Sequence, residues 1–314
     1  MTTNALPTKP AALSVADLRI APRRRRRETV VHLLFLAAAV FSVVVSAAIV
    51  LSLAGNALAF ALRVDPAQLW SDGWFPRRGL YDIKTIVAGT LVISTIGILV
   101  AAPLGLGAGI YMSEYAGRRT RRVLKPVVEI LASIPSVVLG FFALTVISPN
   151  VVQRVSNAPV FNMAAAGIAV GILITPLVAS IAEDALHAVP MYLREASYGV
   201  GARKRSTTLQ IVVPAAVSGI VAALIIGVSR AIGETMIVSI AAGATGGSLF
   251  EVNPFEPGQT MTAAMTALAI GSDRVRGAEL TFESLFFVGM LLFIFTLGLN
   301  LLSDAFVRRV RRRY

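Results

Sequence analysis

Six long blocks of apolar residues limit most strongly what this chain of 314 residues can fold into. Each block is long enough to cross the hydrocarbon core of a bilayer, which takes about 20 helical residues. Hydrophobic residues make up 56% of the chain and charged residues 15%, which is too apolar for a soluble domain. We therefore expect an all-α integral membrane protein, because the blocks lack the polar–apolar alternation of a barrel. The six predicted membrane spans are Val30–Phe60, Ile83–Met112, Val127–Ile147, Met163–Ala182, Val217–Ala242 and Leu285–Leu302.

The residue types present exclude several kinds of chemistry. The chain has no cysteine and two histidines, which leaves no thiolate ligands and too few imidazoles for a histidine metal cluster or a catalytic triad. The phosphate-binding pattern G-x-x-x-x-G-K-[ST] does not occur either. We expect no metal, no cofactor and no catalytic residue on this chain. Any ATP that drives it, with its Mg²⁺, must bind to another chain.

Positive charge is distributed unevenly over the segments between the spans. Of the 29 Lys and Arg residues, 21 fall in the two termini and in the loops 113–125 and 183–210. The alternate loops hold seven, and Arg230 alone lies within a span. The positive-inside rule therefore predicts that both termini and the loop 183–214 face the cytoplasm.

By this reasoning the chain divides into four segments. Residues 1–28 form a basic cytoplasmic tail, predicted to be disordered because its start is rich in Pro, Thr and small residues. Residues 29–60 form the first span, whose apolar run is too long for the core of a signal peptide. Residues 83–304 form the main transmembrane domain, and residues 305–314 a second basic cytoplasmic tail. The arginine clusters of the tails favour contact with anionic lipid over nucleic acid.

Two charged residues, Arg230 and Glu234, lie deep in the fifth predicted span. A charge at the centre of a membrane helix costs about 2.5–3.5 kcal/mol, so such residues usually face a cavity or a partner and mark a transport path. Their spacing of four residues places both on one helical face. In one interpretation they neutralise each other and hold helices together. In the other, Arg230 binds an oxyanion while Glu234 holds Arg230 in place or accepts a proton; phosphate, sulfate and molybdate fit equally well.

A pattern of twenty residues in the loop 183–214 indicates a partner protein. It matches E-A-A-x-x-x-G-x(9)-I-x-L-P, with Ser and Val replacing Ala and Leu at two positions. The pattern resembles the signature loop of the membrane subunits of binding-protein-dependent ABC importers, in which a helical elbow docks onto a separate ATPase. The residues that would form this coupling loop are Glu195, Ala196, Ser197, Gly201, Ile211 and Pro214.

This resemblance implies the type I ABC importer permease (MetI-like) fold. Gly201 would allow the sharp turn of the elbow, and Pro214 would mark the start of the next helix. Glu195 would cap or pair at the surface of the ATPase.

A narrower resemblance concerns the stretch Arg230–Val238, which is similar to the R-A-I-G-E-T-M-x-V segment of PstC-type permease subunits of high-affinity phosphate importers. The resemblance implies that Arg230 and Glu234, with Thr235 as a weaker candidate, lie on the path of phosphate. Other segments that agree with this family are Tyr111–Tyr115, Glu129–Val138, and Leu285–Leu297 with Asn300.

Membership of that family would imply several partners and a place in the plasma (inner) membrane. The partners would be a second homologous permease (PstA-like), an ATPase dimer (PstB-like) and a phosphate-binding protein (PstS-like), in a lipid membrane and without nucleic acid. The sister PstA-type subunit carries a related segment and is an alternative identity for this chain.

Further positions are weaker candidates. Glu129 either pairs with Lys125, four residues before it, or belongs to the pathway. Pro135 is expected to kink its helix, as a hinge or only to shape the bundle. The glycines between residues 103 and 109 predict close helix packing, and Met261–Ile270 predicts a short interfacial helix in the longest outer connection.

Three other functions fit parts of the sequence. A permease for another oxyanion or small solute would differ only in its pathway residues. A secondary transporter would need no ATPase, but it would leave the elbow pattern unexplained. A structural or signalling scaffold would leave Arg230 and Glu234 without a role.

Overall fold

The computed structural model describes residues 22–243, 246–270 and 280–311, which are mostly helical and include one antiparallel hairpin, β1–β2. It separates into two compact units, Met1–Ser52 and Leu53–Tyr314. The elements in chain order are α1 Pro22–Arg63, η1 Pro66–Trp70, β1 Trp74–Phe75, η2 Pro76–Arg78, β2 Leu80–Tyr81, α2 Ile83–Ile110, η3 Tyr111–Tyr115, α3 Arg118–Ala132, α4 Ser136–Phe142, η4 Ala143–Val152, α5 Gln153–Val155, α6 Met163–His187, α7 Met191–Gly199, α8 Lys204–Thr207, η5 Thr208–Val212, α9 Val213–Ala215, α10 Val217–Ile232, α11 Met236–Ala241, α12 Met261–Ile270 and α13 Thr281–Arg311.

The two predicted tails are described only in part. Helix α1 begins at Pro22, so it includes the end of the segment 1–28 for which the sequence predicts disorder. Residues 1–21 lie outside the described part of the chain. At the other end, α13 continues as far as Arg311, and residues 312–314 lie outside the described part.

Among the described residues, five helical segments are long and apolar enough to cross a membrane, and there are six if a pair of helices bent by 70° counts as one span. The all-helical membrane fold predicted from the sequence is therefore confirmed. The single segments are Arg27–Arg63, Ile83–Tyr115, Ser136–Val155, Met163–His187 and Thr281–Leu302, and the bent pair is Lys204–Ala215 with Val217–Ile232.

Two of the predicted spans have the wrong boundaries. The third was predicted at Val127–Ile147, but α3 ends at Ala132 and the apolar segment begins at Ser136. Pro135 accounts for the break, because a proline disfavours helical backbone in the residue before it and cannot donate to the helix itself. Pro135 therefore separates two helices instead of kinking one. The fifth predicted span is divided as well, since three residues separate α10 from α11.

Glycines allow α2 and α6 to pack closely along their length. A Cβ added at Gly171 of α6 would lie 2.6 Å from the Cβ of Val100, and one added at Gly105 of α2 would lie 2.9 Å from the Cβ of Val178. Small residues of this kind let membrane helices approach each other. The predicted packing is thus present at Gly105, whereas nothing lies within 4 Å of a Cβ added at Gly107.

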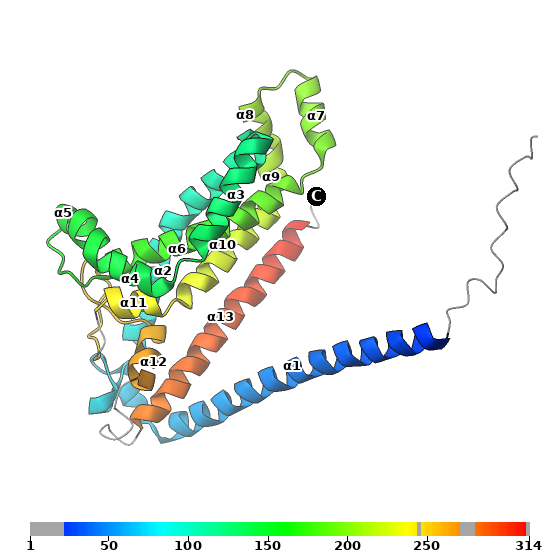
Figure 1. Ribbon diagram of the computed structural model, residues 1–314. Helices are drawn as coiled ribbons and strands as arrows, with labels where there is room; N and C mark the ends of the chain where they lie inside the picture. Colours follow the sequence, from blue (N-terminus) through cyan, green and yellow to red (C-terminus); the bar gives the residue numbers. More distant parts are fainter. Residues whose placement is uncertain (1–21, 244–245, 271–279, 312–314) are drawn as a thin grey trace, which may run out of the picture. The chain divides into compact units, whose positions relative to one another are not determined.

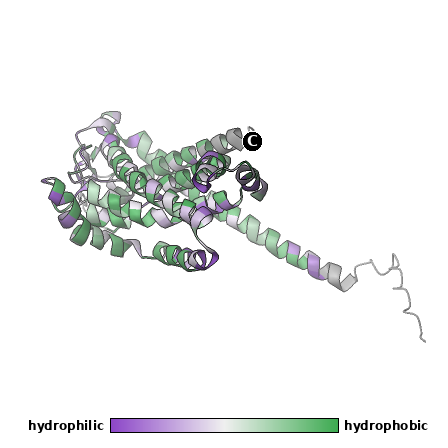
Figure 2. Ribbon diagram, turned by 90° about the horizontal axis from the view of Figure 1, so that it is seen from above, coloured by the Kyte–Doolittle hydropathy of each residue, from purple (hydrophilic) through white to green (hydrophobic). Residues whose placement is uncertain are grey.

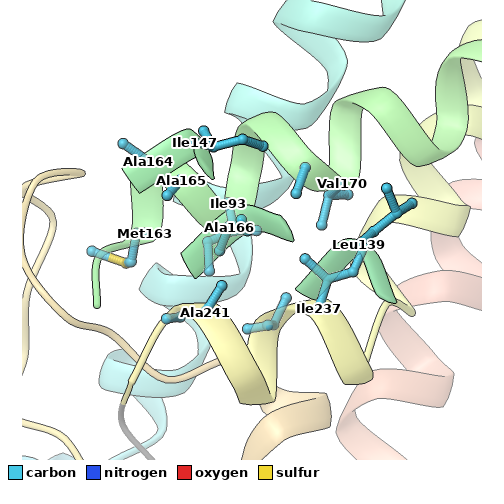
Figure 3. Close-up of a cluster of buried hydrophobic side chains, with 14 of the residues drawn as sticks. Ile93, Leu139, Ile147, Met163, Ala164, Ala165, Ala166, Val170, Ile237 and Ala241 are labelled. Carbon is cyan, nitrogen blue, oxygen red and sulfur yellow. The ribbon is translucent and has the colours of Figure 1, made fainter. Parts of the chain in front are cut away.

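The largest buried cluster joins α2, α4, η4, α6 and α11 (Figure 3). Ile93, Met163, Val170 and Ile237 are buried there among many alanines, whose small side chains keep these helices close together. The start of α6 is fixed beside this cluster by Asn162, whose Oδ1 accepts a hydrogen bond of 2.7 Å from the amide of Ala165.

The unit Leu53–Tyr314 has different short elements at its two ends (Figure 1). Helices α7 and α8 lie at one end, called the elbow end here, and α11, α12 and the hairpin lie toward the other, the loop end. The predicted helix Met261–Ile270 is α12, but Met261 and Leu268 are buried, so it packs into the bundle rather than lying only at an interface. Figure 2 shows hydrophobic residues along the lengths of the helices, as a membrane bundle requires.

Candidate functional site

Arg230 and Glu234 form an ion pair at the end of α10. Arg230 Nη1 lies 2.9 Å from Glu234 Oε2, so the pairing predicted from their spacing is present. The two side chains differ in exposure: that of Arg230 is 46% exposed in this chain and that of Glu234 is 3% exposed. A guanidinium carries five N–H donors, and the exposed part of Arg230 leaves donors for an anionic ligand.

Glu234 occupies the break between α10 and α11 and is fixed from several sides. Its Oε1 accepts hydrogen bonds from the amides of Met236 (3.2 Å) and Ile237 (3.4 Å), which lie in the first turn of α11. Its backbone carbonyl accepts a bond of 2.7 Å from the hydroxyl of Thr262 on α12. A carboxylate is favourable at a helix N-terminus, where amides lack helical partners. Glu234 follows the end of α10 and contacts both α11 and α12. These contacts fix the position from which it pairs with Arg230.

Other polar residues lie beside this pair. The hydroxyl of Thr235 donates to the carbonyl of Gly233 at 3.3 Å, inside the break. The hydroxyl of Ser229, next to Arg230, donates to Oδ1 of Asn300 at 3.2 Å and so links α10 to α13. Thr235 therefore lies at the break between α10 and α11. Its role in the pathway stays a prediction.

The predicted coupling loop forms an elbow of two short helices. Gly201 sits between α7 and α8 with a φ of 81°, a left-handed conformation that favours glycine, as the sequence predicts. Glu195 and Ala196 lie on α7 with exposed side chains. Ser197, which replaces the Ala of the pattern, forms a hydrogen bond of 2.9 Å between its Oγ and Oγ1 of Thr207, so it ties α7 to α8.

The rest of the loop leads back into the bundle. Ile211 is exposed on η5, and Pro214 is the second residue of the short helix α9. The chain then bends by 70° between α9 and α10. The expectation that Pro214 marks the start of the next helix is wrong, because Lys204–Ala215 form one continuous helix with Pro214 next to its end, and α10 begins only after the bend. Large apolar side chains are exposed around the elbow, as on a docking surface; they are Met191, Tyr192, Tyr198, Val200, Leu209 and Ile211.

A buried ion pair that the sequence analysis missed connects the elbow to α2. Arg194 on α7 donates from Nη2 to Oε1 of Glu114 at 2.7 Å, and Glu114 lies in η3, the continuation of α2. The side chain of Arg194 is 11% exposed and that of Glu114 is 5% exposed. The two residues are 80 positions apart, so no local spacing could have revealed them. The sequence offered one signal for each residue. Arg194 directly precedes Glu195, and Glu114 is a charge in an otherwise apolar stretch.

The predicted pairing of Glu129 with Lys125 is not the one that the structure has. Lys125 Nζ lies 3.0 Å from Glu183 and 3.2 Å from Asp184, both on α6, while Glu129 is exposed on α3 outside the apolar segments. Arg121 also pairs with Glu183. The hydrogen bond to Glu183 raises the pKa of Lys125 above its usual value, with Asp184 adding to the effect. These ion pairs hold α3 against α6 at the elbow end.

Solved ABC importers contain chains with this fold. A chain of the MetNI methionine transporter in an inward-facing conformation is 21% identical, with a TM-score of 0.54 over 71% of this chain and 93% of that chain. A chain of a bacterial importer of the acidic polysaccharide alginate is 14% identical, with a TM-score of 0.63 over 90% of this chain and 96% of that chain. Identities this low establish the fold alone. This chain therefore shares its fold with chains of solved ABC importers.

Residues 105–314 match the family described as binding-protein-dependent transport system inner membrane component, and the chain belongs to this family. The family implies a multi-pass protein of the inner membrane that works with a substrate-binding protein and an ATPase. A permease subunit of this kind is not itself an enzyme.

Relatives from several bacteria have more specific names. The chain is 36% identical to the probable ABC transporter permease protein YqgH of Bacillus subtilis, over 59% of this chain and 60% of the relative. It is 30% identical to the phosphate transport system permease protein PstC 1 of Mycobacterium tuberculosis, over 76% and 75%. It is 28% identical to the phosphate transport system permease protein PstC of Mesorhizobium japonicum, over 96% of both chains.

Proposed function

We propose that this chain is the PstC-type permease subunit of an ABC importer and forms part of the path of inorganic phosphate. The names of the relatives from Mycobacterium tuberculosis and Mesorhizobium japonicum support this substrate. The observation that carries the proposal is the half-exposed guanidinium of Arg230, held 2.9 Å from the buried carboxylate of Glu234 at a break in a membrane helix. Guanidinium groups bind phosphate oxygens in a bidentate manner, which suits a fixed binding step in the pathway.

The importer would contain three kinds of partner. A second, homologous permease (PstA-like) would complete the pathway, and the span in α13, only 11% of which is buried in this chain, offers apolar surface for it or for lipid. A PstS-like binding protein would deliver phosphate at the loop end. A PstB-like ATPase dimer would bind the elbow, with Glu195 at the contact. The excess of Lys and Arg at the elbow side supports a cytoplasmic position for the elbow and for both termini.

The mechanism follows from these parts. ATP binding would close the ATPase dimer, and the elbow, seated in a groove of one ATPase as a helix in a groove, would move with it. The bundle would then change which side of the membrane Arg230 faces. Nucleotide and substrate each favour one of two global states, so the two sites are coupled through the bundle.

Phosphate uptake by membrane vesicles that contain this chain and its neighbouring subunits tests the proposal. Wild-type uptake should be saturable and should resist excess sulfate and molybdate. Arg230→Gln should lower uptake by about ten- to a hundredfold, because a charge-assisted hydrogen bond contributes about 1.5–3 kcal/mol. The matched control is Arg154→Gln, which removes an exposed arginine from α5, outside the site, and should leave uptake unchanged.

Two results would contradict the proposal. If sulfate or molybdate abolishes wild-type uptake, the chain is a permease for another oxyanion. If Arg230→Gln transports phosphate like the wild type while present at the same level in the membrane, Arg230 only pairs with Glu234 and holds the helices together.

A further inference from the structure

We propose that Arg194 and Glu114 form the mechanical joint through which the elbow moves α2, and that they are positioning residues for coupled transport. The inference rests on the proposed function, because it assumes that the elbow docks onto an ATPase. It adds to that function the contact by which movement of the elbow reaches the bundle. The joint is defined here as the side chains of Arg194 and Glu114 together with η3.

The geometry of Arg194 is that of a connector between three elements. Its Nη2 donates to Oε1 of Glu114 at 2.7 Å, and its Nε donates to Oε2 at 3.4 Å. The guanidinium therefore contacts both carboxylate oxygens. Its Nη1 donates to the carbonyl of Val189 at 2.6 Å and its Nη2 to that of Leu186 at 2.9 Å. These carbonyls lie at and just after the end of α6. One part-buried side chain on α7 thus contacts the ends of both α2 and α6.

The second arm of the elbow reaches the same element. The ammonium of Lys204 on α8 lies 5.1 Å from the centre of the ring of Tyr115, the residue next to Glu114 in η3. The hydrogen bond between Ser197 and Thr207 joins the two arms to each other. Both halves of the elbow therefore contact η3, a wide helical turn of a type that is frequent at functional sites.

A movement of η3 can be transmitted through α2 and α6 to α10, the helix that carries Arg230. Helix α2 continues directly into η3 and packs along α6 through close glycine contacts, so the two helices can move as one body. Helix α10, which carries Arg230, packs against both. The covalent route from the elbow to α10 is less direct, because the helix Lys204–Ala215 meets α10 at a bend of 70°. We therefore assign the transmission of movement to the joint rather than to the chain connection.

Neutral variants of the joint separate coupling from assembly. Glu114→Gln and Arg194→Gln, each in the complete importer, should lower phosphate uptake per ATP hydrolysed by about tenfold or more, which is within the range of coupling between sites. Basal ATP hydrolysis and copurification of the ATPase should stay within about twofold of the wild type. The double variant should be no worse than Arg194→Gln alone, because Arg194→Gln already removes the interaction that Glu114→Gln removes.

A second readout does not depend on the substrate. The chain has no cysteine, so Ile226→Cys introduces a single thiol, exposed on α10 four residues before Arg230. Trapping the complex with ATP and vanadate should change the rate at which a water-soluble maleimide labels this thiol. The change should disappear when Glu114→Gln is added. Glu283→Gln is the matched control, since it removes a carboxylate from the ion pair with Arg63 at the loop end and should keep the change.

The outcomes distinguish the joint from the proposed function. If the wild type fails to take up phosphate but its thiol still responds to ATP and vanadate, the substrate assignment fails and the joint is still tested by labelling. If Glu114→Gln keeps both the labelling change and the normal uptake per ATP, the joint is overturned. If the variant loses uptake, ATP hydrolysis and copurification of the ATPase together, the ion pair is only structural and the inference is also overturned.

Discussion

Gly201 illustrates how a single residue shapes the elbow through its backbone. Its φ of 81° is accessible to glycine at little cost, whereas a residue with a Cβ pays about 1–2 kcal/mol in this conformation. Space is not the constraint, because nothing lies within 4 Å of a Cβ added there. We expect Gly201→Ala to displace α7 relative to α8 and to lower uptake per ATP hydrolysed, as measured in reconstituted vesicles.

The matched control for this change is two residues earlier. Gly199 ends α7 and also has nothing within 4 Å of an added Cβ, but its φ is not positive. Gly199→Ala should therefore keep coupled uptake. Equal behaviour of the two variants would show that the left-handed turn has no part in coupling.

Residue spacing predicted one ion pair correctly and one wrongly. Arg230 and Glu234 pair across one helical turn, and so, by the same spacing, should Lys125 and Glu129. Lys125 instead contacts Glu183 and Asp184 on another helix. Spacing reports only which side chains share a face of their own helix, and at α3 the neighbouring helix α6 offers Lys125 two carboxylates near its end. Spacing could not reveal the pairing of Arg194 with Glu114 either, because the two residues lie on different elements, 80 positions apart.

At the scale of elements, the contact between α2 and α6 depends on the absence of side chains. We expect Gly171→Ala to destabilise the protein by about 1–3 kcal/mol, as overpacking of a close contact does, because the new Cβ would lie 2.6 Å from that of Val100. Gly107→Ala, which meets nothing within 4 Å, should be neutral or slightly stabilising. The thermal unfolding midpoints of the two purified variants in detergent test this. A Gly171→Ala variant as stable as the wild type would mean that α2 and α6 separate easily.

The existence of the helices could be predicted better than their ends. Apolar runs located the membrane segments, because crossing a bilayer demands length and hydrophobicity together. The same criterion placed the third span too early, since the second half of α3 is also apolar although the helix ends before Pro135. Hydropathy cannot separate an apolar face on an amphipathic helix from a buried span. The breaks around Pro135 and Gly233 depend on backbone geometry that a hydropathy average does not contain.

At the scale of the whole molecule, the distribution of Lys and Arg makes orientation testable. Single cysteines at Val200 (86% exposed, in the elbow) and Leu249 (65% exposed, at the loop end) can be labelled in right-side-out vesicles with a maleimide that does not cross membranes. We expect Leu249→Cys to react at once and Val200→Cys to react only after detergent is added, because the positive-inside rule places the elbow in the cytoplasm. The reverse pattern would rule out docking of the elbow onto a cytoplasmic ATPase.

The break that Glu234 occupies has a consequence for how an anion could pass Arg230. The two oxygens of the carboxylate have separate tasks: Oε2 faces the guanidinium, and Oε1 holds the first amides of α11. In the proposed function, the guanidinium would exchange its partner for a passing anion while Oε1 keeps α11 in place. When the anion leaves, the carboxylate is still positioned to take the guanidinium back. The pair can open and close repeatedly without any helix having to unwind and form again.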